Sequence, residues 1–185
     1  MIKLIDLQDS RTVIDDLAHA YDFDIDRASG DYSWITLSPE HRFLVIAGES
    51  TGGAFLAYGD GDFDRMPILY VTSGGQAGKV ASDLSEFLAI VVAVPYWQDL
   101  LKFSGGGDLA EMRKTAALVH EDYTEDETVT RAKTHMMKIL DIQEIPDPIK
   151  LLHYNVDNTD CTVVAEDGWR YESLFNNLRS NDLCT

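Results

Sequence analysis

The sequence predicts an α+β fold: a central antiparallel sheet flanked by helices, with a helical C-terminal extension. Three observations support this prediction. Short β-prone segments follow one another between residues 42 and 71 and are separated by glycine-rich turns, a pattern typical of an antiparallel meander. Apolar residues at helical spacing precede and follow this region. The length of 185 residues, of which 45% are hydrophobic, suits a globular chain with its own core.

The first half of the chain is predicted to hold one short helix and the strands. The helix covers residues 10–21, with Ser10 as its N-cap. An acidic turn follows, and a first strand is expected from Tyr32 to the Ser38-Pro39 pair. The three strands of the meander are 42–48, 54–58 and 68–71.

A strong helix is predicted after the meander. Residues 73–82 are small and polar, which indicates a flexible loop leading into it. Ser82 is the expected N-cap, and Pro95 is expected to end or kink the helix. The face expected to enter the core carries Leu84, Phe87, Leu88 and Val91.

Three consecutive glycines, Gly105 to Gly107, indicate a boundary between a core, residues 1–104, and an extension, residues 105–185, that packs on the core as one unit. In the extension, Asp108 with Glu111, and Thr124 with Glu127, resemble capping boxes, so each pair predicts the start of a helix. The second helix is expected to end before Pro146 and Pro148. Two strands are then predicted over 151–156 and 161–165, followed by a strand or short helix over 168–178.

The charge balance is strongly acidic. Fifteen lysines and arginines face 32 acidic residues, which gives a net charge of −17. Two interpretations stay open: an acidic surface that keeps the protein dissolved, and a surface that attracts a basic partner. Direct binding to nucleic acid or to an anionic membrane is disfavoured, because both need basic patches.

The location of the protein is predicted to be cytoplasmic. The N-terminus has no basic segment followed by a long apolar run, so it does not resemble a signal peptide. The longest apolar run, Phe87–Tyr96, is about half of what a membrane-spanning helix needs. Cys161 and Cys184 are expected to be free thiols, because two cysteines form neither a disulfide framework nor a zinc site.

Motifs for catalysis or metal binding are incomplete. The segment 73–80 resembles a phosphate-binding loop, but Ser73 replaces its first glycine and Val80 its final hydroxyl residue. The Asp-x-Asp-x-Asp runs that begin at Asp22 and Asp60 lack the glycine and glutamate that a calcium loop requires. The five histidines show no metal-binding spacing. We therefore expect no catalytic residue, metal or cofactor.

A more specific pattern lies between residues 43 and 88, in the segments Phe43–Ala47, Gly52-Gly53, Phe55–Tyr58, Pro67–Tyr70 and Ala81–Leu88. This pattern resembles the SUKH superfamily, the group of yeast cell-wall-assembly regulators and bacterial immunity proteins. The resemblance implies an α+β fold and a non-catalytic role. Its bacterial members bind and neutralise toxins, many of which are nucleases. Two departures from the family are the short, aspartate-rich lead-in and the extension after Gly107.

Three functions follow as hypotheses. The first is an immunity protein that neutralises a basic toxin, possible targets being nucleases that hold phosphates. The second is a regulatory scaffold, and the third is an enzyme with an unrecognised site, which would need a deep pocket with converging polar groups. The expected partner-binding residues are Asp60, Asp62, Asp64 and Glu49, together with the exposed face of the meander.

Overall fold

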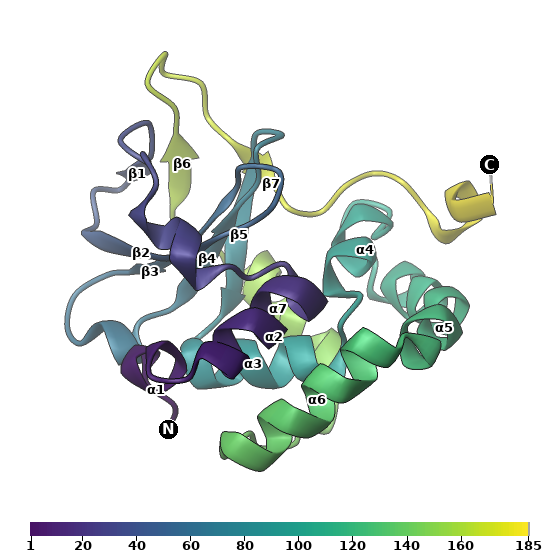
Figure 1. The fold of residues 1–185 in the computed structure, drawn as a ribbon. Helices are drawn as coiled ribbons and strands as arrows, with labels where there is room; N and C mark the ends of the chain where they lie inside the picture. The colour runs from purple at the N-terminus through teal and green to yellow at the C-terminus, as the bar shows by residue number, and fades with distance from the viewer. Residues whose placement is uncertain (185) are drawn as a thin grey trace.

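The computed structural model describes residues 1–184 and shows an α+β fold with a sheet flanked by helices (Figure 1). The helices are α1 (Leu4–Gln8), α2 (Arg11–Tyr21), α3 (Leu84–Ala93), α4 (Trp97–Lys102), α5 (Leu109–Glu125), α6 (Glu127–Ile139) and α7 (Pro148–Asp157). The strands are β1 (Thr36–Ser38), β2 (Phe43–Gly48), β3 (Ala54–Tyr58), β4 (Ile68–Val71), β5 (Gln76–Ala81), β6 (Thr162–Val164) and β7 (Glu172–Ser173). Short 3₁₀ helices are η1 (Ile25–Ser29), η2 (Phe63–Arg65) and η3 (Ser180–Cys184).

The main sheet has the strand order β2-β3-β4-β5-β7. The first four strands are antiparallel neighbours, so the predicted meander is confirmed; β7 adds to β5 in parallel. A second sheet pairs β1 with β6, with Leu37 opposite Val163. Residues beyond 105 therefore supply one strand to each sheet.

The main sheet is buried on both faces. In β3 all five residues are buried, with Phe55 and Leu56 pointing to opposite faces. Phe55 lies in an aromatic cluster whose ring centroids are 4.9 Å from Phe23 and 4.8 Å from Tyr70. Leu56 belongs to a second cluster that includes Val163 of β6. The sheet is thus the middle layer of the molecule.

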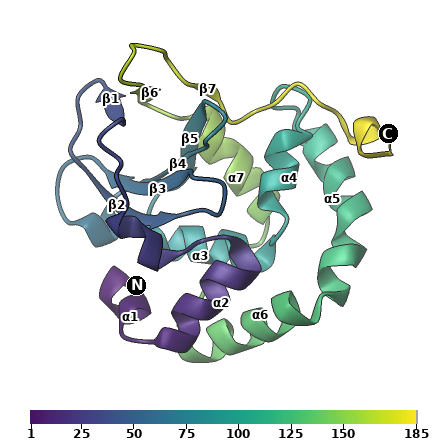
Figure 2. The ribbon, with the colours of Figure 1, turned by 45° about the horizontal axis from the view of Figure 1, so that its top comes forward.

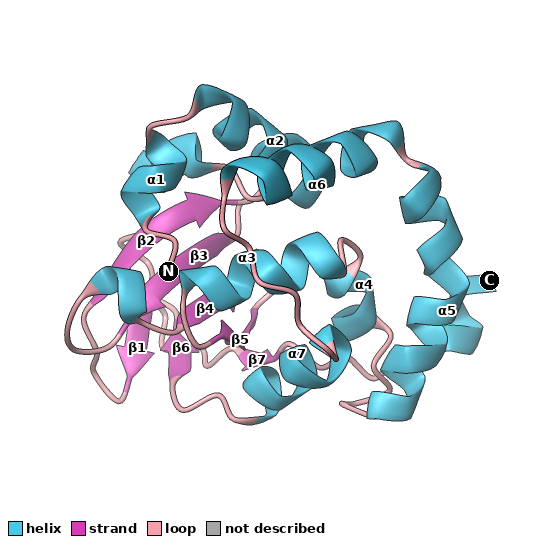
Figure 3. Cartoon of the chain, turned by 90° about the horizontal axis from the view of Figure 1, so that it is seen from below, coloured by secondary structure: helices cyan, strands magenta, loops and turns pink. Residues whose placement is uncertain are grey.

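The helices cover the face of the sheet that carries Phe55. Seen from below, α3 crosses the sheet (Figure 3). In Figure 2, α5 and α6 form an arc outside α2, α3 and α4. Seven of the ten residues of α3 are buried, which explains why this helix is apolar around most of its circumference.

The N-caps differ in part from the predictions. Ser10 occupies the N-cap position of α2, as predicted. In α3 the cap is Asp83, whose Oδ1 accepts the Glu86 N–H at 2.9 Å, and Ser82 instead donates to the Glu86 carboxylate. An aspartate side chain accepts hydrogen bonds from the backbone amides of the first turn as well as a serine does. Asp83 can therefore cap the helix in place of Ser82.

The extension helices begin at aspartates. Asp108 caps α5, as predicted, but the Glu111 side chain contacts Lys114 and Ser180, so no capping box forms. Asp126, not Thr124, caps α6 by accepting the N–H groups of the second and third helical residues.

Two segments were predicted wrongly. Residues 76–81 are strand β5 rather than a flexible loop, and a tight turn from Thr72 to Gln76 connects them to β4. Residues 151–156 belong to helix α7 rather than to a strand. Pro148 stands in its first turn and Asp147 accepts the Lys150 N–H at 3.1 Å, so the helix has a standard start.

Of three smaller predictions, two need adjustment and one is confirmed. The first predicted strand is shorter, because only Thr36–Ser38 pair as β1. The predicted strand at 161–165 is confirmed as β6. Of residues 168–178, only Glu172 and Ser173 are extended in the sheet as β7.

The segment after β7 ties the C-terminal end to α4 and α5. The N–H groups of Gly105 and Gly106 donate to the carbonyls of Leu178 and Asn176, each at 2.7 Å. The buried Glu111 carboxylate accepts the Ser180 hydroxyl at 3.0 Å. Two glycines with positive φ let the backbone turn toward this segment. The glycine segment 105–107, which was predicted to mark a boundary, is therefore also where the C-terminal segment binds.

Candidate functional site

The predicted acidic site has its aspartates in the loop between β3 and β4. Asp60 and Asp62 are exposed, and Asp62 also accepts the Asp64 N–H at 3.3 Å, which caps η2. Asp64 is partly buried, because its Oδ1 accepts the Leu4 N–H at 2.9 Å. Two of the three aspartates thus face solvent, whereas Asp64 holds the N-terminal segment against the loop.

Glu49 lies apart from these aspartates and is buried. It is only 5% exposed, and its Oε1 accepts the Gly53 N–H at 3.1 Å and the Thr51 hydroxyl at 2.5 Å. These bonds close the turn between β2 and β3, which lies at the opposite end of β3 from Asp60. The structure does not bring Glu49 together with the three aspartates, and its carboxylate is occupied within the fold.

A groove lies between the end of α3 and helices α5 and α6. Its volume is about 460 Å³, and a neighbouring hollow of about 250 Å³ shares Val92, Ala93, Lys133 and Met137 with it. Most of the shared lining is aliphatic. The groove was not predicted, because it depends on the angle at which α5 and α6 meet.

Two tyrosines and a histidine stand at the α5 side of the groove. The Tyr96 hydroxyl lies 3.0 Å from Nδ1 of His120, and the Tyr123 hydroxyl donates to Asp99 Oδ2 at 3.1 Å. Burial raises the pKa of Tyr96, and burial together with Asp99 raises the pKa of Tyr123 to about 12. Both phenols therefore keep their protons at neutral pH and serve as hydrogen-bonding groups.

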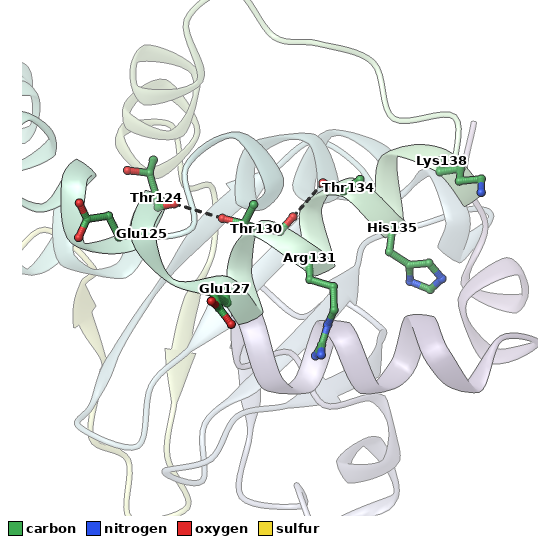
Figure 4. Close-up of a pocket in the computed structure, with 8 residues that line it drawn as sticks. All are labelled: Thr124, Glu125, Glu127, Thr130, Arg131, Thr134, His135 and Lys138. Carbon is green, nitrogen blue, oxygen red and sulfur yellow. Dashed lines mark hydrogen bonds between the residues drawn. The ribbon is translucent and has the colours of Figure 1, made fainter.

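A further hollow of about 630 Å³ lies along the surface of α6 (Figure 4). Thr130 and Thr134 donate to backbone carbonyls, at 3.2 Å and 2.9 Å, and His135 contacts Asp16 of α2. In Figure 4 the side chains of Arg131 and Lys138 extend in different directions. In an active site, the polar groups converge on one point. The polar groups of this hollow do not.

The thiol of Cys161 is not activated. Burial, with a smaller effect of Asp160, raises its pKa to about 11. The neighbouring Tyr58 hydroxyl donates to Asp160 Oδ1 at 2.5 Å. A nucleophilic cysteine needs a lowered pKa, so this environment keeps the thiol protonated.

The motifs that resemble ligand loops serve other purposes. The segment 73–80 consists of the turn after β4 and most of strand β5, whereas a phosphate-binding loop connects a strand to a helix. Asp22 accepts the Ser50 N–H and hydroxyl, and Asp26 pairs with Arg11 at 2.7 Å. Among the side chains of residues 1–183, no group of three or more His, Cys, Asp or Glu is placed to hold a metal ion.

In comparisons with protein families, with curated proteins and with solved structures, nothing matches this chain. Across the described part of the chain, none of the helices combines the length and apolar character needed to cross a membrane. Any function must therefore be argued from the residues and their surroundings.

Proposed function

We propose that this chain is a non-catalytic binding protein that neutralises a basic protein in the cytoplasm, as an immunity protein of SUKH type neutralises a toxin. The observation that carries the proposal is the excess of carboxylates. If every lysine and arginine paired with one acidic residue, 17 carboxylates would still lack a cationic partner, which is the net charge of −17. A basic partner would supply the missing cations.

Such a surface affects association in a measurable way. An excess of negative charge attracts a basic protein over a distance and raises the association rate, and salt screens this attraction. Fifteen cations cannot neutralise 32 anions within the chain, so mutual repulsion of the carboxylates also costs stability. Binding a basic partner would relieve this repulsion.

The environments of Tyr123 and Cys161 do not suit acid–base or nucleophilic catalysis. General acids and bases work best with pKa values near the operating pH. Burial moves the pKa values of Tyr123 and Cys161 further from neutrality, to about 12 and about 11. Neither group is prepared for proton transfer or nucleophilic attack.

The test is direct binding to a basic toxin domain encoded beside the gene. Isothermal titration calorimetry at about 50 and 300 mM NaCl should give a one-to-one complex that weakens at least about ten-fold at the higher salt, because the contact is electrostatic. An acidic domain of similar size serves as control. Co-expression should restore growth of cells that carry the toxin. The proposal is refuted if no neighbouring toxin binds and none is neutralised.

The groove beside α3 favours a second candidate, a regulatory scaffold. Its lining by Val92, Ala93 and Met137 suits the apolar face of a peptide helix. Binding of that kind depends on apolar contact, so its affinity should change little between the two salt concentrations. The same titration therefore separates the two functions.

A further inference from the structure

An exposed tryptophan stands on the turn that follows β6. Trp169 is 62% exposed. The turn is well defined: the Ala165 N–H donates to the Trp169 carbonyl at 2.8 Å, and the Trp169 N–H donates to Asp167 Oδ1 at 3.0 Å. Gly168 has a φ of +86°, a conformation that a glycine adopts readily. The indole is thus presented to solvent by an ordered turn.

Two more aromatic rings lie beside this turn. Trp34 and Tyr171 are stacked, with ring centroids 6.2 Å apart and planes inclined by 23°. Both rings pack against the apolar cluster on the second face of the sheet, which holds them in place. Together with Ala165, Glu166 and Asp167 they line an open hollow of about 530 Å³. Trp169 follows Asp167 on the same turn, outside the lining of this hollow. We call Trp34, Tyr171, Glu166 and Asp167, with Trp169 beside them on the turn, the aromatic platform.

The charge around the platform is negative. Tyr171 also lines an adjacent hollow of about 260 Å³, which adds Asp157 and Glu172. Among the described residues that line these two hollows there is no lysine, arginine or histidine. The hollows beside α6 differ, since they include cationic side chains such as Lys133. Arg170, next to Trp169, is exposed but is outnumbered by the carboxylates.

We propose that the aromatic platform receives an arginine side chain of the basic partner. This inference rests on the proposed function and gives it a location. A guanidinium group is planar, so it can stack on an indole or phenol face while its N–H groups donate to a carboxylate. The turn offers an aromatic face, from Trp169, and two carboxylates, from Glu166 and Asp167. A lysine ammonium lacks the planar stacking surface, so arginine is preferred over lysine.

The three tryptophans allow a direct test by NMR with the ¹⁵N-labelled full chain. Their indole N–H signals belong to Trp34, Trp97 and Trp169, and Trp97 is buried in the core. Titration with a peptide of alternating arginine and glycine should shift the Trp169 and Trp34 signals in a saturable way and leave the Trp97 signal in place. The matching lysine peptide should bind at least about three-fold more weakly. Equal binding of both peptides, or no shift at Trp169, overturns the inference.

Two variants and one control complete the experiment. Trp169→Ala should weaken binding of the arginine peptide about three- to five-fold, the size expected of one exposed cation–π contact. The double variant Glu166→Gln with Asp167→Asn should weaken it by a similar factor. The control is the double variant Glu121→Gln with Asp122→Asn. It also removes one glutamate and one aspartate charge, but from the exposed surface of α5. If the control weakens binding as much as the platform variant, the attraction is diffuse and the inference is wrong.

The basic toxin domain separates this inference from the proposed function. If the wild-type chain binds the domain and Trp169→Ala binds it equally well, the platform is not the contact, while the proposed function stands. If the wild-type chain binds neither the arginine peptide nor any basic domain, both are wrong. Circular dichroism of each variant shows that it is folded; Trp169 is largely exposed, so its removal leaves the core intact.

Discussion

Replacing Leu56 with alanine tests the layered architecture most directly. Leu56 is 0% exposed and lies on the face of β3 that the β1–β6 pair covers. Truncating a fully buried leucine to alanine costs about 2–5 kcal/mol, from lost apolar burial and the cavity left behind. For a chain of this length, each kcal/mol lowers Tm by about 2–4 °C. A central value of about 3 kcal/mol therefore predicts a fall of about 6–12 °C.

The matched control makes the same chemical change on the surface. Leu118 lies on α5 and is 54% exposed, so Leu118→Ala should change Tm by less than about 2 °C. Differential scanning calorimetry of the two variants and the wild type measures both shifts. If Leu56→Ala lowers Tm by less than about 2 °C, or if Leu118→Ala lowers it equally, the second face of the sheet is not covered in the way described.

Three further predictions concern single side chains. Asp83→Ala removes the N-cap of α3 and should cost about 1 kcal/mol in urea denaturation. The pKa of Glu111 is lowered, chiefly by Lys114 and then by Ser180, so its contribution to stability is present above about pH 4.3 and is lost on acidification. The Tm difference between wild type and Glu111→Gln should therefore shrink toward pH 3. Cys161, whose thiol pKa is about 11, should react slowly with iodoacetamide at pH 8 in the folded protein and rapidly in denaturant.

Each of these has a control or a contrary outcome. Asp83→Asn keeps a capping oxygen and should retain most of the stability that Asp83→Ala loses. A constant Tm difference between pH 7 and pH 3 would show that the pKa of Glu111 is the same in the folded and unfolded states, and would contradict the lowered pKa. Equal alkylation rates of Cys161 in buffer and in denaturant would contradict its burial. Mass spectrometry of the peptide that contains Cys161 distinguishes it from Cys184.

The local pattern of the sequence predicted those elements whose partners lie nearby in the chain. The strands β2, β3 and β4 follow one another along the chain, so β-prone segments and the glycine-rich turns between them suffice. Strand β5 was missed because it contains Gly78, which in isolation suggests a loop. A Cβ at this position would lie 3.0 Å from Leu174 Cδ1, so the glycine serves a contact with the far end of the chain. Such a long-range requirement leaves no local signal.

Helix α7 shows a different source of error. The composition of residues 151–156 favoured a strand. Asp147 and Pro148 gave a helix-start signal in the sequence, but the composition was given more weight.

For the candidate site, the acidic composition predicted that carboxylates would be numerous. It did not predict which carboxylates are exposed and which are hydrogen-bonded within the fold. Glu49 is occupied in a turn, and Trp169 is prominent only because its turn presents it. Both facts depend on backbone geometry rather than on residue type.

The pairing of β1 with β6, and of β5 with β7, has a consequence for synthesis on the ribosome. The N-terminal half emerges before the strands that complete both sheets, because β6 and β7 come much later in the chain than most of the strands they join. Until they arrive, the edge of β5 and the apolar surface around Leu56 have no cover, and exposed edges and apolar surfaces of this kind favour aggregation. A nascent chain that stalls after α6 would therefore be a natural client for a chaperone.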